Sequence, residues 1–275
     1  MALDSDTLQQ LLDTLTRFVN ERLRPLESKT AADDRIPQEV VEEMKALGLF
    51  GLTIPEAYGG LGLNMQEEAA VARVFGRTSP AFRSAFGTNV GIGSQSLVID
   101  GTEDQKQFYL PKMATGEIVG SFCLSEPEAG SDAASVRTTA VKDGDDYLIN
   151  GTKRYITNAP WADLFTVFAR TDASVKGARG VSAFLVDRKT SGVSLGVPYR
   201  RMGQQGAPVC DVIFEDVRVP AEKLLGGAEN VGFITAMKVL DKGRLHISAI
   251  SVGVAERLIE DATKYAIERK QFNQP

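Results

Sequence analysis

The sequence has few of the residues from which metal sites and disulfide frameworks are built. Its 275 residues include one histidine and two cysteines, Cys123 and Cys210, which lie far apart within apolar runs. So small a set does not supply the ligands of a zinc site. Two such cysteines are typical of reduced, buried thiols in a cytosolic protein rather than of a disulfide framework. We therefore expect no metal and a cytoplasmic location.

The sequence also lacks a basic cluster and a long apolar run. Lysine and arginine number 31 against 36 acidic residues, and they are scattered along a chain whose net charge is −5. This distribution gives no electrostatic footprint for nucleic acid or for an anionic membrane surface. No run approaches the roughly 18 apolar residues that span a bilayer, and the polar, acidic start is typical of neither a signal nor a transit peptide. We expect no nucleic-acid partner and no membrane insertion.

Apolar residues make up 43% of the sequence, which is enough for substantial cores, and their spacing changes twice along the chain. Up to about residue 118 the spacing is helical. Two capping boxes are expected to begin helices in this region, at Asn64 with Glu67 and at Thr102 with Gln105. We expect the second of these helices to end before Pro111, because proline interrupts a helix.

From about residue 119 the sequence changes to short β-rich runs that are separated by polar turns. A hairpin is expected to turn at Asp143 and Gly144. Further strands are expected over residues 164–170, 181–187 and 209–219. A succession of antiparallel hairpins predicts a small barrel or sandwich.

Beyond Gly232 the helical spacing returns and continues almost to Pro275. The long apolar stripe of this last helix needs partner helices that the sequence does not contain, so either a neighbouring subunit covers it or the chain continues in nature. The expected fold class is α+β multidomain. It has an N-terminal all-helical domain over residues 1–118, a central antiparallel β-barrel or sandwich domain over 119–228, and the first helices of a C-terminal helical bundle over 229–275, with the remainder of that bundle absent.

One motif allows an alternative interpretation as a hydrolase. The segment "GVSLG" at residues 192–196 matches the nucleophile-elbow pattern, and Ser194, Asp241 and His246 follow in the order of an α/β-hydrolase triad. The elbow serine must lie on a strand-to-helix turn, yet two prolines, two glycines and no helical spacing follow it. We therefore disfavour a hydrolase and interpret His246 as an ordinary histidine on a helix flank.

A loop with many small polar residues, "CLSEPEAGSDAAS" at 123–135, follows an expected strand. The hydroxyls of Ser125 and Ser131 would emerge from the sheet edge together with backbone amides. Such neutral donors suit a ligand with several carbonyls or ring nitrogens. The two carboxylates of the loop, Glu126 and Glu128, are expected to face solvent, as loop carboxylates usually do.

A second sheet edge is expected at "RYITNAP", residues 154–160. Tyr155 and Thr157 are two residues apart and so would point to the same side of a strand. An aromatic face beside a hydroxyl suits a planar heteroaromatic ring. The alternative is a tyrosine and a threonine that simply pack on the sheet.

Several motifs together resemble the acyl-CoA dehydrogenases. They are "PEAYGGLG", "CLSEPEAGSDAAS", "YLINGTKRYITNA", "RMGQQGAPVCDVIFEDVRVP", "DKGR" and "ATKYAIERKQF". Their order and spacing follow the family over essentially the whole chain. The family's layout of helical, β and helical domains agrees with the spacing described above. The resemblance implies an FAD flavoprotein of fatty acid metabolism.

The resemblance also implies roles for individual positions. Those that would contact FAD are Phe122, Cys123, Leu124, Ser125, Ser131, Tyr155, Ile156 and Thr157. Those that would face the coenzyme A part of the substrate are Ser131, Asp241, Lys242, Gly243 and Arg244. Those that would reach the FAD of a neighbouring subunit are Arg269, Gln271 and Phe272. The last set implies a homo-oligomer, either a dimer or a tetramer.

The reaction that the resemblance implies is α,β-dehydrogenation of an acyl-CoA thioester to the trans-2-enoyl-CoA, with electrons passed to an electron-transfer flavoprotein. Relatives place the glutamate base either in the C-terminal bundle or immediately before the arginine of "DKGR". The latter position is Gly243 here, so the base is expected outside these 275 residues. Two alternatives stay open: a flavin monooxygenase or oxidase on the same fold, and a non-catalytic fragment of it.

Overall fold

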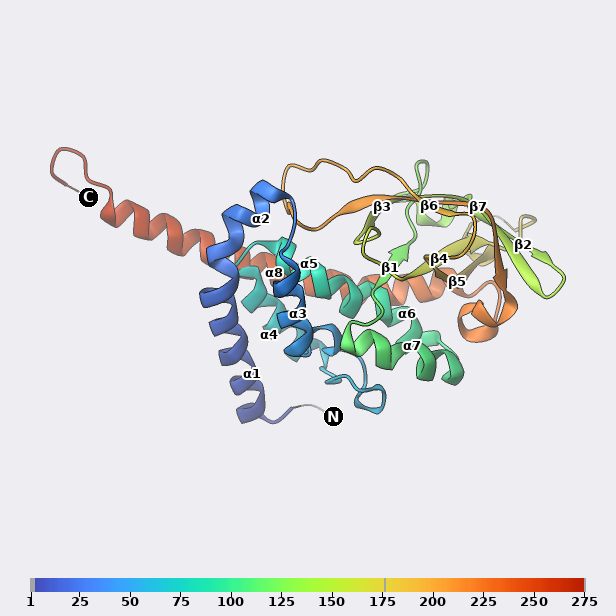
Figure 1. The fold of residues 1–275 in the computed structure, drawn as a ribbon, viewed down its shortest axis with the longest axis horizontal. Coiled ribbons are helices and arrows are strands. Elements are labelled where there is room, and N and C mark those ends of the chain that lie inside the picture. Colours follow the sequence, from blue (N-terminus) through green and yellow to red (C-terminus); the bar gives the residue numbers. More distant parts are fainter. Residues whose placement is uncertain (1–2, 176, 275) are drawn as a thin grey trace.

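The computed structural model describes residues 3–175 and 177–274. The helices are α1 (Ser5–Phe18), α2 (Glu27–Asp33), α3 (Gln38–Ala46), α4 (Met65–Gly76), α5 (Pro80–Thr88), α6 (Ser94–Asp100), α7 (Glu103–Thr115) and α8 (Gly232–Glu268). The strands are β1 (Gly120–Cys123), β2 (Thr139–Asp143), β3 (Asp146–Thr157), β4 (Leu164–Arg170), β5 (Val181–Asp187), β6 (Val193–Leu195) and β7 (Val209–Pro220). The strands gather at one end of the molecule above α6 and α7, and α1 to α3 lie at the other end (Figure 1). The expected order of a helical, a β and a second helical part is confirmed.

Two helices begin at the expected capping boxes. The side chain of Asn64 accepts from the backbone N–H of Glu67, and the Glu67 carboxylate accepts from the N–H of Asn64 in return. Thr102 and Gln105 make the same reciprocal pair at the start of α7. Both predictions are confirmed because a capping box depends only on residues three apart.

The prediction that α7 ends before Pro111 is wrong. The helix continues through Pro111 to Thr115 and ends at Gly116, whose φ is +75°. A proline inside a helix costs about 3 kcal/mol. The turn around it buries Leu110 and Met113 completely, and this burial offsets the cost.

The strands form one seven-stranded sheet in the order β1-β4-β2-β3-β7-β6, with β5 also paired to β4. The β2–β3 hairpin is confirmed to within one residue, since Asp143 pairs with Asp146. The expectation of purely antiparallel pairing is wrong for β1, which runs parallel to β4. These two strands are not consecutive in sequence, and local patterns do not reveal such a pairing. The two cysteines are buried free thiols, as expected.

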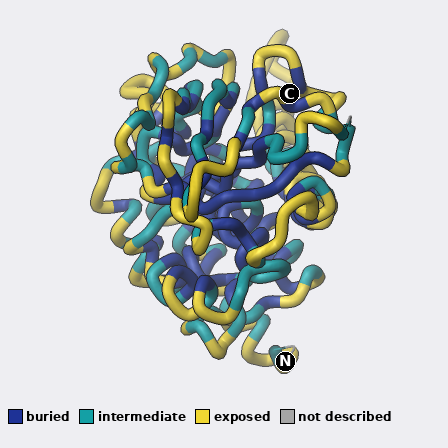
Figure 2. The backbone as a smooth tube through the Cα atoms, turned by 90° about the vertical axis from the view of Figure 1, so that its right-hand side faces the viewer, coloured by how far each residue is buried: buried dark blue, intermediate teal, exposed yellow. Residues whose placement is uncertain are grey.

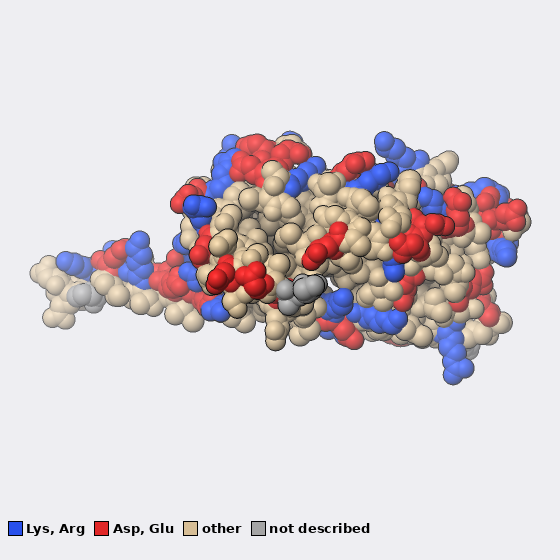
Figure 3. Space-filling view, turned by 90° about the horizontal axis from the view of Figure 1, so that it is seen from below, with Lys and Arg blue, Asp and Glu red and all other residues tan. Residues whose placement is uncertain are grey.

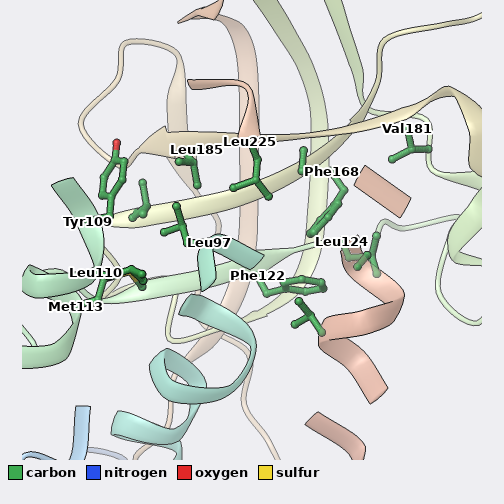
Figure 4. Close-up of a cluster of buried hydrophobic side chains, with 14 of the residues drawn as sticks. Leu97, Tyr109, Leu110, Met113, Phe122, Leu124, Phe168, Val181, Leu185 and Leu225 are labelled. Atoms are coloured by element: carbon green, nitrogen blue, oxygen red, sulfur yellow. The ribbon is translucent and has the colours of Figure 1, made fainter. Parts of the chain in front are cut away.

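A shared hydrophobic core ties the end of β1 to the helices (Figure 4). Phe122 and Leu124 pack there with Phe168 of β4 and Leu97 of α6, and the rings of Phe122 and Phe168 are 4.7 Å apart. Val239 of α8 belongs to the same core. Buried strands cross the middle of the body, and exposed loops surround them (Figure 2). The core therefore fixes the end of β1 relative to α8.

Helix α8 is 37 residues long, and its last part projects from the body (Figure 1). Leu258 and Tyr265 are 62% and 66% exposed there, so the expected partner for this stripe stays a prediction. Acidic and basic side chains are interspersed over the face that Figure 3 shows. Within residues 3–175 and 177–274, no helix combines the length and the apolar character needed to cross a membrane.

Candidate functional site

A cavity of about 410 Å³ lies where the end of β1, the end of β3 and the first half of α8 meet. The expected cofactor residues that line it are Phe122, Leu124, Ser125, Ser131, Tyr155, Ile156 and Thr157. The side chain of Cys123 is not among the lining residues, because alternate residues of a strand point to opposite faces. It packs in the core of the sheet instead. We call this space the first cavity.

The backbone of the loop after β1 is tied to β3. The N–H of Arg154 donates to the carbonyl of Ser125 at 2.8 Å, and the Lys153 ammonium donates to the carbonyl of Leu124 at 3.2 Å. The hydroxyls of Ser125, Ser131 and Thr157 have no hydrogen-bond partner among the described residues, and all three residues line the first cavity. The loop therefore offers free neutral donors from a fixed backbone.

Tyr155 lies in a β-bulge rather than in a regular strand. The register between β3 and β7 shifts between Lys153 and Ile156, and Tyr155 has a φ of +59°. A non-glycine residue in this left-handed region costs about 1 kcal/mol or more. The simple alternation that predicted Tyr155 and Thr157 on one side therefore does not describe this strand, yet both residues line the first cavity. Tyr155 is 64% exposed, and the centroid of its ring lies 5.1 Å from that of Tyr199.

The expectation that Glu126 faces solvent is wrong. Its carboxylate is buried, with Oε1 2.7 Å from the ammonium of Lys153, and it accepts from the N–H groups of Arg137 and Thr138. Burial alone would raise the pKa of Glu126, but the charge of Lys153 and these hydrogen bonds hold it below its ordinary value. Glu126 thus links the loop after β1 to Lys153 of β3 and to the backbone just before β2. Glu128 is exposed, as expected.

Helix α8 forms the opposite wall of the first cavity through Phe233, Met237, Leu240 and Arg244. Of the five residues expected to face coenzyme A, Ser131 and Arg244 line this cavity. Asp241 lies one turn before Arg244 and accepts from its Nη1 at 2.6 Å. Lys242 instead donates to Gln95 on α6 at 3.0 Å.

A second cavity of about 460 Å³ adjoins the first. The two share Ile92, Leu240 and Arg244 as lining residues. The second cavity is lined by Arg83, Gly87, Thr88, Gly91, Ile92, Leu240, Gly243, Arg244, Ile247 and Ser248. A Cβ built on Gly243 would lie 3.3 Å from Ile92 Cγ2, so a side chain at this position of α8 would narrow the cavity. The two cavities therefore lie side by side, the first between the sheet and α8 and the second between helices.

His246 lies on a helix, α8, as expected, but it is buried and bonded on both sides of its ring. The imidazole is buried between α4, α5 and α8, where Nδ1 is 2.5 Å from Glu68 Oε1 and Nε2 is 2.7 Å from Arg83 Nε. An arginine N–H can only donate, so Nε2 accepts and the proton of a neutral imidazole lies on Nδ1, facing Glu68. Burial, together with the charge of Arg83, lowers the pKa of His246 and keeps it neutral.

The three residues expected to reach a neighbouring subunit lie away from both cavities. Arg269, Gln271 and Phe272 follow the end of α8, and Phe272 is 99% exposed. This end of the chain projects far from the sheet (Figure 1). The structure does not bring these residues to the cavities of their own chain, and their role across a subunit interface stays a prediction.

The hydrolase alternative finds no support in the backbone. Ser194 lies within β6, paired with Ile213 of β7, and not on a turn into a helix. The segment after β6 is not helical. The elbow context that the chemistry requires is therefore missing from this part of the described chain.

Sequence reasoning missed Arg83, Arg154 and Ile92 as lining residues. Their positions depend on how α5, β3 and the turn between α5 and α6 pack together, which no local motif encodes. One local signal did exist for Arg83. Gly87 lies one helical turn later, and a Cβ built there would lie 2.3 Å from Arg83 Nε, so a glycine is needed beside this side chain.

Comparisons with known proteins agree with this geometry. The chain matches the acyl-CoA dehydrogenase N-terminal domain over residues 5–117, the middle domain over 121–217 and the C-terminal domain over 230–275. It is 39% identical over 267 residues to a 3-(aryl)acrylate reductase of Clostridium sporogenes, covering 97% of this chain and 70% of that protein. It is 44% identical over 236 residues to the caffeyl-CoA reductase-Etf complex subunit CarC of Acetobacterium woodii, covering 86% and 62%.

Solved structures give the same result. The butyryl-CoA dehydrogenase of Megasphaera elsdenii matches with a TM-score of 0.93 at 33% identity, over 100% of this chain and 73% of that one. An acyl-CoA dehydrogenase of Bacillus anthracis that was solved in complex with FAD matches with a TM-score of 0.90 at 36% identity, over 98% and 46%. The chain belongs to the acyl-CoA dehydrogenase family, whose members are FAD-dependent oxidoreductases acting on CH–CH groups.

The first cavity fits a flavin. A ring system with carbonyls and ring nitrogens needs neutral donors at its edge and an aromatic or apolar surface against its face. The free hydroxyls of Ser125 and Thr157 supply the donors, and the exposed ring of Tyr155 supplies a face. Glu126, whose charge would oppose flavin reduction, is turned away and neutralised by Lys153. The donor set therefore suits FAD.

Proposed function

We propose that the protein catalyses α,β-dehydrogenation of an acyl-CoA thioester to the trans-2-enoyl-CoA. The observation that carries the proposal is the junction of the two cavities. The first cavity is lined by the free hydroxyls and the exposed tyrosine, and the second by small and apolar residues together with Arg83. The two cavities share Ile92, Leu240 and Arg244 as lining residues. A thioester that spans this junction would have its acyl carbons beside the flavin ring.

The residues of the first cavity would hold and tune the cofactor. Ser125 and the backbone of Leu124 would donate to the pyrimidine end of the ring, Thr157 would bond near N5, and Tyr155 would pack against the face opposite the substrate. Bound FAD would supply the acceptor for a hydride. Donors aimed at the pyrimidine end stabilise negative charge as it develops there, and this lowers the barrier to transfer.

The residues around the junction would hold the thioester. Arg244, a cation on the rigid α8 helix, is suited to the phosphates of coenzyme A, with Ser131 on the opposite side. The acyl chain would enter the second cavity. Within the described chain no glutamate lines either cavity.

Two partners belong to the proposal. The first is an electron-transfer flavoprotein, and a relative that is named as part of a reductase-Etf complex supports it. The second is a further copy of the chain, in a dimer or tetramer, and the exposed apolar residues Leu258 and Tyr265 on α8 support it.

Anaerobic titration of the FAD-loaded protein, expressed from its complete reading frame, tests the proposal. We expect loss of the oxidised flavin absorbance with at least one acyl-CoA from a panel of short, branched and aromatic thioesters. Because two relatives are named reductases, the chemically reduced protein should also be mixed with enoyl- and arylacryloyl-CoA. No spectral change in either direction would overturn the proposal. Rapid reoxidation by oxygen after reduction by acyl-CoA would favour the oxidase alternative.

A further inference from the structure

The second cavity contains a buried cation that the proposed dehydrogenation of an unsubstituted acyl chain does not use. Arg83 on α5 is only 9% exposed, and it lines this cavity together with Gly87 and Gly91. A Cβ built on Gly91 would lie 4.0 Å from Arg83 Nη2, so the terminal nitrogens face the space that Gly91 leaves open. The guanidinium therefore lies at the wall of the cavity.

Most of the hydrogen-bonding capacity of Arg83 is free. A guanidinium has five N–H donors. Nε donates to His246 at 2.7 Å, whereas among the described residues the two terminal nitrogens have only a 3.5 Å contact from Nη2 to the carbonyl of Gly87. No carboxylate of the described chain forms an ion pair with Arg83, since the nearest one, on Glu68, is separated from it by the imidazole.

Glu68, His246 and Arg83 lie in a row that ends at the second cavity. The Glu68 carboxylate lies on the inner side, the neutral His246 in the middle, and the Arg83 guanidinium on the cavity side. Burial lowers the pKa of Arg83 to about 10, so the group stays cationic at neutral pH. A buried cation without a directly bonded anion is costly to maintain, and an anion brought to it would form strong, charge-assisted hydrogen bonds.

We propose that the substrate is an acyl-CoA whose acyl chain ends in a carboxylate, and that the terminal nitrogens of Arg83 bind this carboxylate in the second cavity. The proposal rests on the proposed function, because it takes the second cavity as the acyl site. The apolar residues Ile92, Leu240 and Ile247 contact the methylene carbons between the two ends, and the planar guanidinium matches the carboxylate. Arg83 is a specificity-determining residue.

Binding to the oxidised, FAD-loaded protein, expressed from its complete reading frame, tests this proposal without relying on turnover. Dissociation constants would be measured by calorimetry and by perturbation of the flavin spectrum. The ligands are succinyl-, glutaryl- and adipyl-CoA, each with the thioester in which the terminal carboxylate is replaced by a neutral amide. We expect at least one carboxylate to bind about tenfold or more tightly than its matched amide.

Replacement of Arg83 locates the effect. In Arg83→Met we expect the affinity for the carboxylate to fall by about 30-fold or more, because an anion in an apolar cavity then has no partner. The affinity for the matched amide should change by less than about threefold, because that ligand makes no charged contact. Equal losses for both ligands would mean that Arg83 only supports the fold.

A second pair of variants leaves Arg83 in place. Gly91→Asp puts a carboxylate beside Arg83 Nη2, where a built Cβ lies 4.0 Å away, and Gly91→Asn puts a neutral group of the same size there. We expect Gly91→Asp to abolish the preference for the carboxylate and Gly91→Asn to retain it. These two variants test whether Arg83 binds the carboxylate even if Arg83→Met does not fold.

Three outcomes count against the proposal. Equal binding of carboxylate and amide by the unmodified protein would overturn it and leave the proposed function intact. An equal preference for the carboxylate over the amide in Gly91→Asp and Gly91→Asn would also overturn it and leave the proposed function intact. Binding of no thioester at all would overturn the proposed function and this inference with it.

Discussion

Glu126 and Glu128 stand two residues apart in the same loop, and their surroundings differ completely. Glu126 is buried against Lys153, whereas Glu128 lies in solvent. The partner of Glu126 is 27 residues further along the chain, and His246 meets Glu68 over 178 residues. Local patterns correctly predicted the solvent-facing carboxylate and failed for these buried pairs, because tertiary contacts between distant segments create them.

Removal of the Glu126 charge should destabilise the protein strongly. Glu126→Gln leaves the Lys153 ammonium buried without a counter-charge, so we expect the free energy of unfolding to fall by about 3 kcal/mol or more. Glu128→Gln is the matched control and should change it by less than about 0.5 kcal/mol. Urea unfolding of the three proteins measures both values. Equal effects of the two substitutions would contradict the account of the loop.

The same pair predicts a dependence of stability on pH. The pKa of Glu126 is lower in the folded protein than in the unfolded chain, where it is about 4.3. The stabilisation is therefore present above about pH 4.3 and is lost as the pH falls through the folded-state pKa. We expect the difference in unfolding free energy between the unmodified protein and Glu126→Gln to shrink below about pH 4.5. A difference that does not change down to about pH 3 would count against this interpretation.

At the scale of helices and strands, features set by neighbouring residues were predictable. The capping boxes of α4 and α7 and the β2–β3 hairpin appear where their motifs are. Features set by packing were not, among them the continuation of α7 through Pro111, the parallel pairing of β1 with β4 and the bulge at Tyr155. Motifs identified the lining residues that follow β1 and most of those at the end of β3, because these motif residues lie at strand ends, but they missed Arg154, Ile92 and the apolar residues of α8.

The crossing of α4 and α8 predicts opposite effects at two glycines of α8. A Cβ on Gly253 would lie 2.1 Å from the carbonyl oxygen of Arg73, so Gly253→Ala must push the helices apart and should cost about 2 kcal/mol or more. A Cβ on Gly243 meets only Ile92, at 3.3 Å, and Ile92 borders both cavities and so has room to shift. Gly243→Ala should therefore gain up to about 1 kcal/mol from helix propensity. Thermal and urea unfolding of both variants would measure this. A Gly253→Ala protein as stable as the unmodified one would contradict the close approach.

At the scale of the whole molecule, the change from helical to strand spacing and back was enough to predict the layout of the chain. The sequence did not reveal that the end of β1 and α8 meet around two joined cavities, because that depends on the shared core of Phe122, Phe168 and Val239. The boundaries proposed at residues 118 and 228 and the cytoplasmic location stay predictions.

The exposed stripe on α8 predicts assembly. Leu258 and Tyr265 are more than half exposed, and large apolar side chains in such a row are typical of a covered surface. We expect the protein, expressed from its complete reading frame, to be a dimer or tetramer at micromolar concentration. Light scattering coupled to size exclusion measures the mass. A monomer would contradict the proposed oligomer.

The affinity for FAD tests the central claim most directly, namely that the loop after β1 and the end of β3 hold the cofactor. Ser125 lines the first cavity with a free hydroxyl, whereas Ser135, in the same loop, is exposed and bonded to Asp132. We expect the protein to bind FAD, Ser125→Ala to weaken binding by up to about tenfold, and Ser135→Ala to change it by less than about twofold. A protein that takes up no FAD, or two serine variants with the same affinity, would contradict the account.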